Sequence, residues 1–293
     1  MSRRSLMGPL GLVALIAVGG SAPVGAQSPS ASAVTLPACS AIAETPAAAP
    51  ATSALPTASA ATSPMAASEL TVFGAASLKG AFEAFVPALT ADTGITPLYS
   101  FDASSALRTQ IEQGAPADVF ASADTANVVT LVEAGAATDP AVFACNQLTI
   151  IVPAGNPAGI TSAQDLGRAG VRVIAAGDEV PITKYATQLV ANLGITDAYA
   201  ANVVSKEDNV AAVRSKIELG EGDAGIVYVT DAIASGDKVE QVAVPSDANV
   251  PATYAAAIVT GTDQPDDSAA FLGWLTGPEG QAGLASFGFL PAP

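Results

Sequence analysis

The sequence of 293 residues contains no histidine. This absence excludes Ser-His-Asp and Cys-His nucleophilic catalysis, and it removes the most common general base and the most common transition-metal ligand. The two cysteines, Cys39 and Cys145, are too far apart in sequence to form a CxxC metal or redox motif. The histidine-dependent catalytic arrangements and the CxxC motif are therefore missing, and the sequence favours a protein that is not an enzyme.

Basic residues are also scarce. Lysine and arginine total 11 against 27 acidic residues, which gives a net charge of -16. Binding of nucleic acid requires a basic surface, so this charge argues against a nucleic-acid partner. The same charge gives no long-range attraction for a small anion. Any anion bound by this chain must be held by local, oriented hydrogen bonds.

Long apolar runs are absent except near the N-terminus. Residues 1–26 have the form of a secretory signal peptide, with Arg3 and Arg4 before an apolar stretch at 10–18 and small residues at 24–26. The apolar stretch is shorter than the roughly 20 residues of a membrane-spanning helix. The sequence therefore predicts a protein exported to the periplasm or to the outer face of the cell membrane.

Residues 27–68 consist almost entirely of Ala, Ser, Thr and Pro. This composition cannot bury a core and predicts a disordered tether. Within it, Leu-Pro-Ala-Cys at 36–39 resembles a lipoprotein cleavage box, although about twenty residues separate it from the apolar stretch of the signal peptide. Three states of Cys39 remain open at this point: a lipid anchor, a disulfide with Cys145, or a free thiol.

The rest of the chain alternates between short apolar runs and amphipathic stretches, which is typical of an α/β fold with parallel strands and crossover helices. The alternation predicts one lobe from residues 69–146 and 251–293 and a second lobe from residues 147–250. The chain leaves the first lobe, builds the second and returns, which is the layout of a hinged binding protein. The expected strands lie at 70–73, 95–99, 117–121, 146–152, 171–175, 201–204, 225–228 and 254–260.

Four predicted turns between a strand and a helix carry small or capping residues at the helix start. They are Ala76-Ser77, Ser104-Ser105, Pro181-Ile182 and Asp208-Asn209-Val210. The carboxyl ends of strands are where ligands bind in such sheets, and each helix start offers free N–H donors with a partial positive charge. The pattern indicates a binding site in which uncharged hydrogen-bond donors hold an oxyanion. The alternative is ordinary helix capping, which alone would explain Ser104 and Ser105.

The chain contains TVFGAASL at 71–78, SFDASSALRTQIEQGAPADVFASAD at 100–124, GIVY at 225–228 and FGF at 287–289. In this order the motifs resemble the periplasmic molybdate-binding proteins of ABC importers, and GAPADVFASAD is the most specific of them. The resemblance covers the chain from about residue 69 to its end. It implies the two-lobed fold of periplasmic binding proteins, in which each lobe is a mostly parallel sheet flanked by helices and a hinge of two crossovers joins the lobes.

The resemblance also implies the ligand and the residues that bind it. The family binds molybdate or tungstate through two serines of the first lobe, backbone N–H groups of the second lobe and a tyrosine hydroxyl. The matching positions here are Ser77, Ser104 (with Ser105 as its alternative), Ile182, Val210 and Tyr228. Two of these positions depart from the usual family pattern. Ile182 stands where alanine is usual, and the sequence EDNV, which ends at Val210, stands where EDV is more common.

Molybdenum would be held as its oxyanion, with no protein atom as a metal ligand and no cofactor. The expected partner is an ABC permease in the membrane, to which a monomeric binding protein delivers the ion. Three other functions are considered: a receptor for sulfate or phosphate, a secreted enzyme of similar fold, and a displayed interaction protein. Phosphate carries a proton and needs an acceptor, for which Asp102 is the nearby candidate. The plain alternative for Tyr228 is a core aromatic at a strand end.

Overall fold

The computed structural model describes residues 34–40 and 68–293. The predicted signal peptide (1–26) and most of the predicted tether (27–68) lie outside the described residues. Among the helices described, none is long and apolar enough to cross a membrane.

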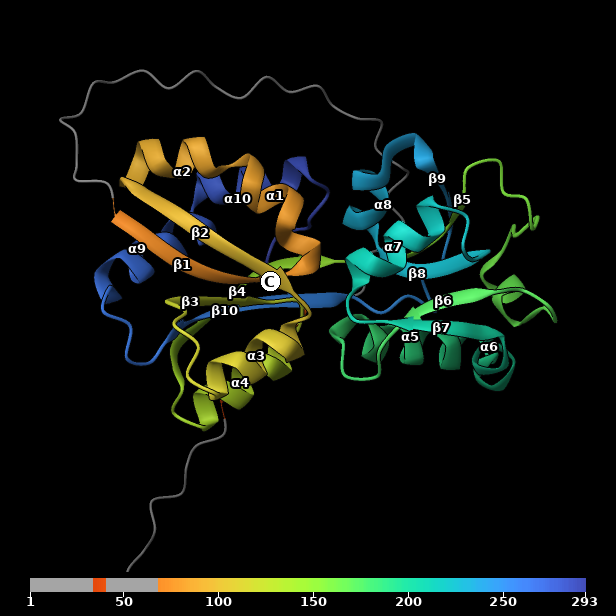
Figure 1. The fold of residues 1–293 in the computed structure, drawn as a ribbon, viewed down its shortest axis with the longest axis horizontal. Coiled ribbons are helices and arrows are strands. Elements are labelled where there is room, and N and C mark those ends of the chain that lie inside the picture. The colour runs from red at the N-terminus through yellow and green to blue at the C-terminus, as the bar shows by residue number, and fades with distance from the viewer. Residues whose placement is uncertain (1–33, 41–67) are drawn as a thin grey trace, which may run out of the picture. The chain divides into compact units, whose positions relative to one another are not determined.

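The first lobe is built on a five-stranded sheet (Figure 1). Its strand order is β2-β1-β3-β10-β4, so the last long strand of the chain lies between strands from the first half. The strands are β1 (Ser68–Ala75), β2 (Ile95–Asp102), β3 (Val119–Ser122), β4 (Ala137–Asn146) and β10 (Ala252–Val259).

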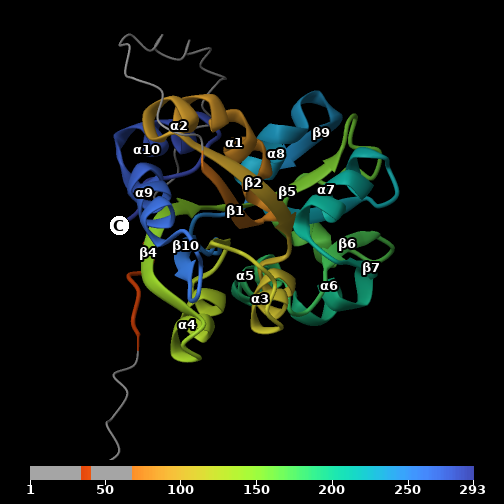
Figure 2. The same cartoon turned by 60° about the vertical axis from the view of Figure 1, so that its left-hand side comes forward.

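Helices cover both faces of this sheet, as the turned view in Figure 2 shows. Alternation along β1 directs Leu70 and Val72 into one apolar cluster and Phe73 into another, because successive side chains of a strand point to opposite faces. The helical segments of this lobe are η1 (Ala76–Leu78), α1 (Lys79–Ala84), α2 (Val86–Thr93), α3 (Ser104–Glu112), α4 (Thr125–Glu133), α9 (Pro265–Thr276) and α10 (Pro278–Ser286).

The second lobe repeats the arrangement with the order β7-β6-β8-β5-β9. Its strands are β5 (Leu148–Pro153), β6 (Val173–Ala176), β7 (Val203–Glu207), β8 (Ala224–Tyr228) and β9 (Val239–Val242). Its helical segments are η2 (Ala163–Gly167), α5 (Pro181–Asn192), α6 (Thr196–Asn202), α7 (Val210–Glu218), α8 (Val229–Ser235) and η3 (Gly236–Lys238).

Each sheet contains one antiparallel strand, and its other four strands run in the same direction, which agrees with the prediction of mostly parallel sheets. In the first, β1 pairs in parallel with β2 and β3, whereas β10 is antiparallel to both its neighbours. In the second, β6 pairs in parallel with β7 and β8, whereas β5 is antiparallel to both its neighbours. The antiparallel direction of β5 and β10 follows from the two crossovers. Each of these strands is the first after a crossover, so it begins at the sheet edge where the parallel strands end and runs away from it.

Residues 34–40 are packed onto the first lobe, which corrects the predicted disorder for this part of the tether. Cys39 forms a disulfide with Cys145 at the end of β4, and its backbone N–H donates to Thr253 Oγ1 at 3.0 Å. Leu36 packs against the apolar cluster that contains Phe73. Of the three states of Cys39 that the sequence left open, the structure contains the disulfide, and a sulfur bonded to Cys145 has no valence for a thioether lipid.

Candidate functional site

The turns that follow six strands of the two sheets meet around one small cavity. Its volume is about 10 Å³, close to the minimum for one water molecule, and this excludes a sugar or a peptide. All five residues that the family resemblance indicated line it. The complete lining is Ala75, Ala76, Ser77, Asp102, Ala103, Ser104, Ala123, Val180, Pro181, Ile182, Asn209, Val210 and Tyr228.

Several helical segments begin at this cavity, and η1, α3 and α5 among them have no side-chain cap. The N-cap residues of η1, α3 and α5 are Ala75, Ala103 and Val180, none of which can accept a hydrogen bond through its side chain. In contrast, α7 is capped, since Asn209 Oδ1 accepts from the third N–H of its first turn at 3.0 Å. A helix offers no partner to the N–H groups of its first turn, so these donors are left for whatever occupies the cavity.

The two adjacent serines at the start of α3 differ in position. Ser104 is 1% exposed, and its Oγ accepts a hydrogen bond from the N–H of Ala123 at 3.0 Å. This bond leaves the hydroxyl hydrogen of Ser104 free to donate into the cavity. Ser105 is only partly buried and does not line the cavity. Neither serine caps α3 through its side chain, so the capping alternative does not describe this turn.

Tyr228 ends β8, and its hydroxyl is fully buried without a hydrogen-bond partner among the described residues. Its ring packs edge-on against Tyr185 and Tyr254, with centroid distances of 6.4 and 5.6 Å. Burial, and next the nearby Tyr254, raise the pKa of Tyr228 well above its ordinary value. The hydroxyl is therefore protonated at neutral pH and is a donor that the protein itself leaves unused.

A fully buried tyrosine of β10, Tyr254, lies directly behind Ser77. The Ser77 Oγ and Tyr254 Oη atoms are 2.8 Å apart. The sequence analysis did not predict this pair, because the two residues are 177 positions apart. Tyr254 also lies in an apolar strand, ATYAAAIV, whose composition indicates only a buried strand of the core.

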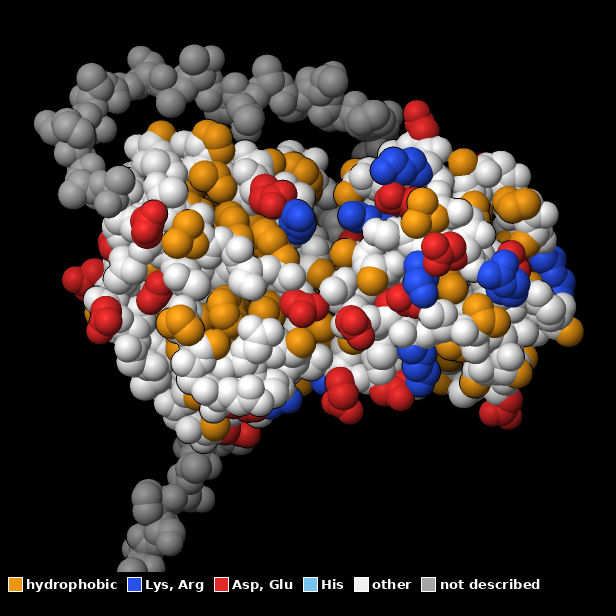
Figure 3. Space-filling model, viewed as in Figure 1, with side chains coloured by type: hydrophobic (Ala, Val, Ile, Leu, Met, Phe, Trp, Pro, Cys, Tyr) orange, Lys and Arg blue, Asp and Glu red, His pale blue; other side chains and the backbone are white. Residues whose placement is uncertain are grey.

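Asp102 is the one charged side chain in the lining. Its Oδ1 accepts hydrogen bonds from the backbone N–H of Ala103 at 2.8 Å and from Nδ2 of Asn209 at 2.9 Å. No lysine or arginine lines the cavity. On the face drawn in Figure 3, basic side chains lie mostly on the second lobe, and some of them flank the junction between the lobes. The cavity is thus a set of neutral donors with one engaged carboxylate.

Comparison with known proteins identifies the family of this chain. A family model described as bacterial extracellular solute-binding protein matches residues 70–290. The chain belongs to this family.

Among its relatives, the molybdate-binding protein ModA of Mycobacterium tuberculosis is 39% identical over 225 residues, which are 76% of this chain and 85% of that protein. A solved substrate-binding domain of a putative molybdenum ABC transporter from Clostridium difficile is 27% identical, with a TM-score of 0.60 over 77% of this chain and 99% of the other. The sulfate-binding protein SubI of M. tuberculosis shares the fold, with a TM-score of 0.71 and 22% identity over 77% of this chain and 87% of SubI.

These likenesses confirm the two-lobed α/β fold and the expectation of a binding protein rather than an enzyme. In a solute-binding protein, contacts between the lobes stabilise the closed arrangement around the ligand. Three of the contacts between the lobes near the cavity are Asn209 to Asp102, Lys184 Nζ to Asp124 Oδ2 at 3.3 Å, and the Tyr185 hydroxyl to the carbonyl of Ala123 at 3.3 Å. Sequence reasoning missed all three, since each joins residues of different lobes.

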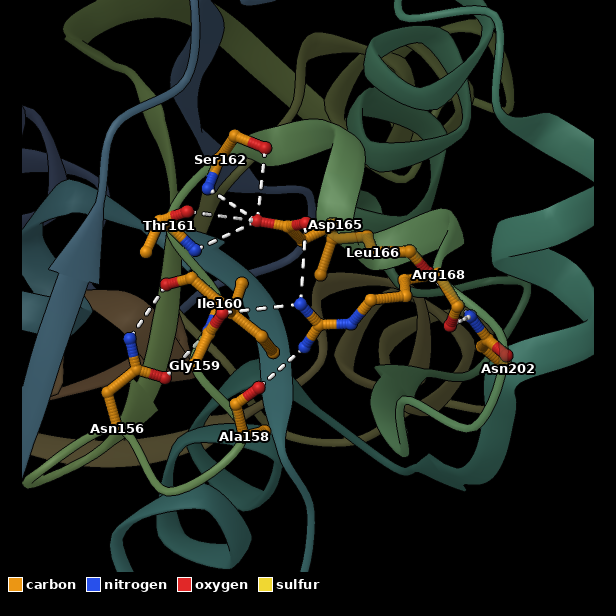
Figure 4. A network of polar contacts seen from close by, with 10 residues as sticks. All are labelled: Asn156, Ala158, Gly159, Ile160, Thr161, Ser162, Asp165, Leu166, Arg168 and Asn202. Atoms are coloured by element: carbon orange, nitrogen blue, oxygen red, sulfur yellow. Dashed lines mark hydrogen bonds and ion pairs between the residues drawn. The ribbon is translucent and has the colours of Figure 1, made fainter.

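A second polar cluster, at the far end of the second lobe, is structural (Figure 4). Asp165 Oδ2 accepts from the backbone N–H groups of Thr161 and Ser162 at 2.9 Å each, and these bonds lower the pKa of Asp165. Arg168 donates to a carbonyl of the same loop. These groups satisfy one another, as a capping box at the start of η2 requires. Among the described residues there is also no cluster of three or more His, Cys, Asp or Glu that could hold a metal ion.

Proposed function

We propose that this solute-binding protein captures molybdate, or the equivalent tungstate, between its two lobes and delivers it to an ABC permease. The observation that carries the proposal is a small cavity at which uncapped helix starts from both lobes converge and the Tyr228 hydroxyl has no partner among the described residues. A buried donor without a partner costs free energy, and an oxyanion is the kind of ligand that would remove this cost at several donors at once.

Each of the five indicated residues has a role in this proposal. Ser77 and Ser104 donate through their hydroxyls, Tyr228 donates through its phenol, and Ile182 and Val210 donate through backbone N–H groups. The Ile182 side chain belongs to the apolar core, so its size does not obstruct a backbone donor. Hydrogen bonds to a charged group contribute about 1.5–3 kcal/mol each, and a set of this size offsets much of the desolvation of a dianion.

The absence of a lysine or arginine in the lining supports recognition by hydrogen-bond geometry. Hydrogen phosphate would need an acceptor for its proton. The lining has one carboxylate that could accept, Asp102, which receives two hydrogen bonds on Oδ1, whereas all five indicated residues would donate; this excess of donors favours a fully deprotonated oxyanion. Sulfate is also fully deprotonated, and it is the second candidate because SubI shares this fold. We further propose that the protein acts outside the cell as a monomer, without a cofactor or a nucleic-acid partner.

Titration calorimetry of the full mature chain, after unfolding and refolding to remove bound ions, tests the proposal. Molybdate and tungstate should release heat with a 1:1 stoichiometry, whereas sulfate and hydrogen phosphate should bind more weakly by at least about tenfold. Tighter binding of sulfate than of molybdate would assign the second candidate. The absence of binding by all four ions would refute an oxyanion receptor.

A further inference from the structure

A second cavity lies between the two lobes and shares Ser77 with the proposed oxyanion site. Its volume is about 220 Å³. Ser77, Gly80 and Phe287 are among the residues that line it from the first lobe, and Arg214 and Asp231 are among those from the second. Because each lobe supplies part of the wall, a hinge motion that separates the lobes exposes this cavity to solvent.

Asp231, in the first turn of α8, is a buried carboxyl group in this cavity. It is 2% exposed, and its Oδ2 has no hydrogen-bond partner among the described residues. Lys79 and Glu83 line the same cavity from the first lobe, and their side chains are 61% and 55% exposed. The cavity thus extends from the surface to the carboxyl group, so a proton from solvent can reach it.

The ion pair of Asp231 compensates its burial only in part. Arg214 Nη1 lies 3.9 Å from Asp231 Oδ1, which is too long for a hydrogen bond, and Arg214 Nε lies 3.4 Å from Glu218 Oε1. A buried carboxylate without full pairing is costly, and protonation removes this cost. Burial accordingly raises the pKa of Asp231 to about 7, against the opposing effect of Arg214.

The other ionisable side chains on the elements packed around Asp231 are paired, exposed or uncharged. They are Lys216, Glu218, Tyr228, Asp237, Lys238, Glu240 and Tyr254. The charged members form ion pairs or are exposed to solvent. The two tyrosines remain protonated at neutral pH, because burial raises the pKa of each well above its ordinary value.

An anion in the neighbouring site disfavours a charged Asp231 further. Ser77 lines both cavities, and Tyr228 of the oxyanion site lies three residues before Asp231. A nearby like charge raises the pKa of a carboxyl group. Burial and the ligand therefore act in the same direction, and both act only when the lobes are closed.

We propose that Asp231 takes up a proton from solvent when the lobes close over the oxyanion, which makes ligand binding tighter as the pH falls. This inference rests on the proposed function. With the lobes apart, the carboxyl group is hydrated and is ionised at neutral pH. With the lobes closed, its neutral form is favoured, and by linkage the proton in turn favours closure.

Calorimetry of molybdate binding to the full mature chain, in two buffers with different heats of ionisation, counts the protons taken up. At pH 7 we expect an uptake of about half a proton or more per bound ion, because a group with a pKa of about 7 is half protonated there. Kd should fall about tenfold from pH 8 to pH 6, since the pKa of the carboxyl rises on closure from about 4 to about 7. The chain contains no histidine and its two cysteines form a disulfide, so few other groups titrate in this range.

Asp231→Asn removes the titrating group and keeps its shape. This variant should bind molybdate without proton uptake and with the same Kd at pH 6 and pH 8. Glu83→Gln is the matched control, because it removes a carboxylate from the exposed end of the same cavity. It should retain the proton uptake and the pH dependence of the parent.

A parent protein that binds molybdate without proton uptake would overturn the inference and leave the molybdate function intact, and so would equal uptake by the parent and Asp231→Asn. A parent protein that does not bind molybdate would overturn both. If circular dichroism shows that Asp231→Asn does not fold, Arg214→Gln replaces it. This variant removes the positive charge paired with Asp231, so the proton uptake should extend to higher pH, and an unchanged pH profile would overturn the inference.

Discussion

Removal of one oxygen atom, in Tyr228→Phe, should stabilise the ligand-free protein and weaken ligand binding at the same time. The hydroxyl is buried without a partner among the described residues, while the ring packs against Tyr185 and Tyr254. Phenylalanine keeps the ring contacts and removes only the unsatisfied group. The two effects have opposite signs because the hydroxyl is a cost to the empty site and a donor to the occupied one.

The size of each effect follows from the burial of the hydroxyl. An unsatisfied buried polar group costs about 1–3 kcal/mol, so the free energy of unfolding of the ligand-free variant should rise by up to that amount. For a protein of this size, each kcal/mol raises Tm by about 2–4 °C. Loss of a hydrogen bond to a charged ligand costs about 1.5–3 kcal/mol, which corresponds to a Kd about 10-fold to 150-fold larger.

Thermal melts with and without molybdate, together with calorimetry, measure both effects. Tyr99→Phe is the matched control, since the Tyr99 hydroxyl is also buried without a partner but does not line the cavity. It should stabilise the protein without changing Kd. The reasoning fails if Tyr228→Phe binds molybdate as tightly as the parent, or if it lowers Tm while Tyr99→Phe raises it.

Three further predictions concern other described residues. Ser104→Ala should weaken molybdate binding and lower the free energy of unfolding by about 1–3 kcal/mol, because the Ala123 N–H loses its acceptor, whereas Ser105→Ala should change stability by less than about 0.5 kcal/mol. Calorimetry and urea unfolding check this pair, and equal effects would mean that the wrong serine is assigned. Burial raises the pKa of Asp231 to about 7, partly opposed by Arg214, so the folded protein retains a proton that the unfolded chain releases near pH 4. The free energy of unfolding should therefore fall by up to about 1.4 kcal/mol per unit as pH rises from about 4 to 7, and urea unfolding of Asp231→Asn should lack this slope. Cys39→Ser should lower the free energy of unfolding by about 2–4 kcal/mol, as should a thiol reductant on the parent; an unchanged urea midpoint in both would contradict a stabilising disulfide.

The sequence predicted the fold well where local pattern decides it. Short apolar runs predicted β1, β2 and β8, and proline at a first helical position predicted the start of α5. Strand direction was harder to predict, because nothing in the local composition of β5 or β10 distinguishes a strand that enters a lobe from one that leaves it. The region after Asp124 was also left unassigned, although Asp124 caps α4 by accepting from the N–H of Asn127.

The residues of the candidate site also differ in whether local sequence could predict them. Ser77, Ile182 and Val210 could be placed at one edge because each follows a strand and begins a helix. The choice between Ser104 and Ser105 could not be made from sequence, since it depends on a contact with Ala123, 19 positions away.

The acidity of the chain and the neutrality of its cavity are compatible because they act over different distances. Exposed charges are screened beyond about 8 Å at physiological ionic strength, so a net charge of -16 repels an approaching anion only weakly. In the low local dielectric of a buried cavity, each oriented N–H or O–H interacts more strongly with an anion than it would in solvent. A lysine in the lining would attract sulfate, phosphate and molybdate alike. Neutral donors in fixed directions instead distinguish anions by size and by whether they carry a proton, which is the distinction that a receptor for one scarce oxyanion requires.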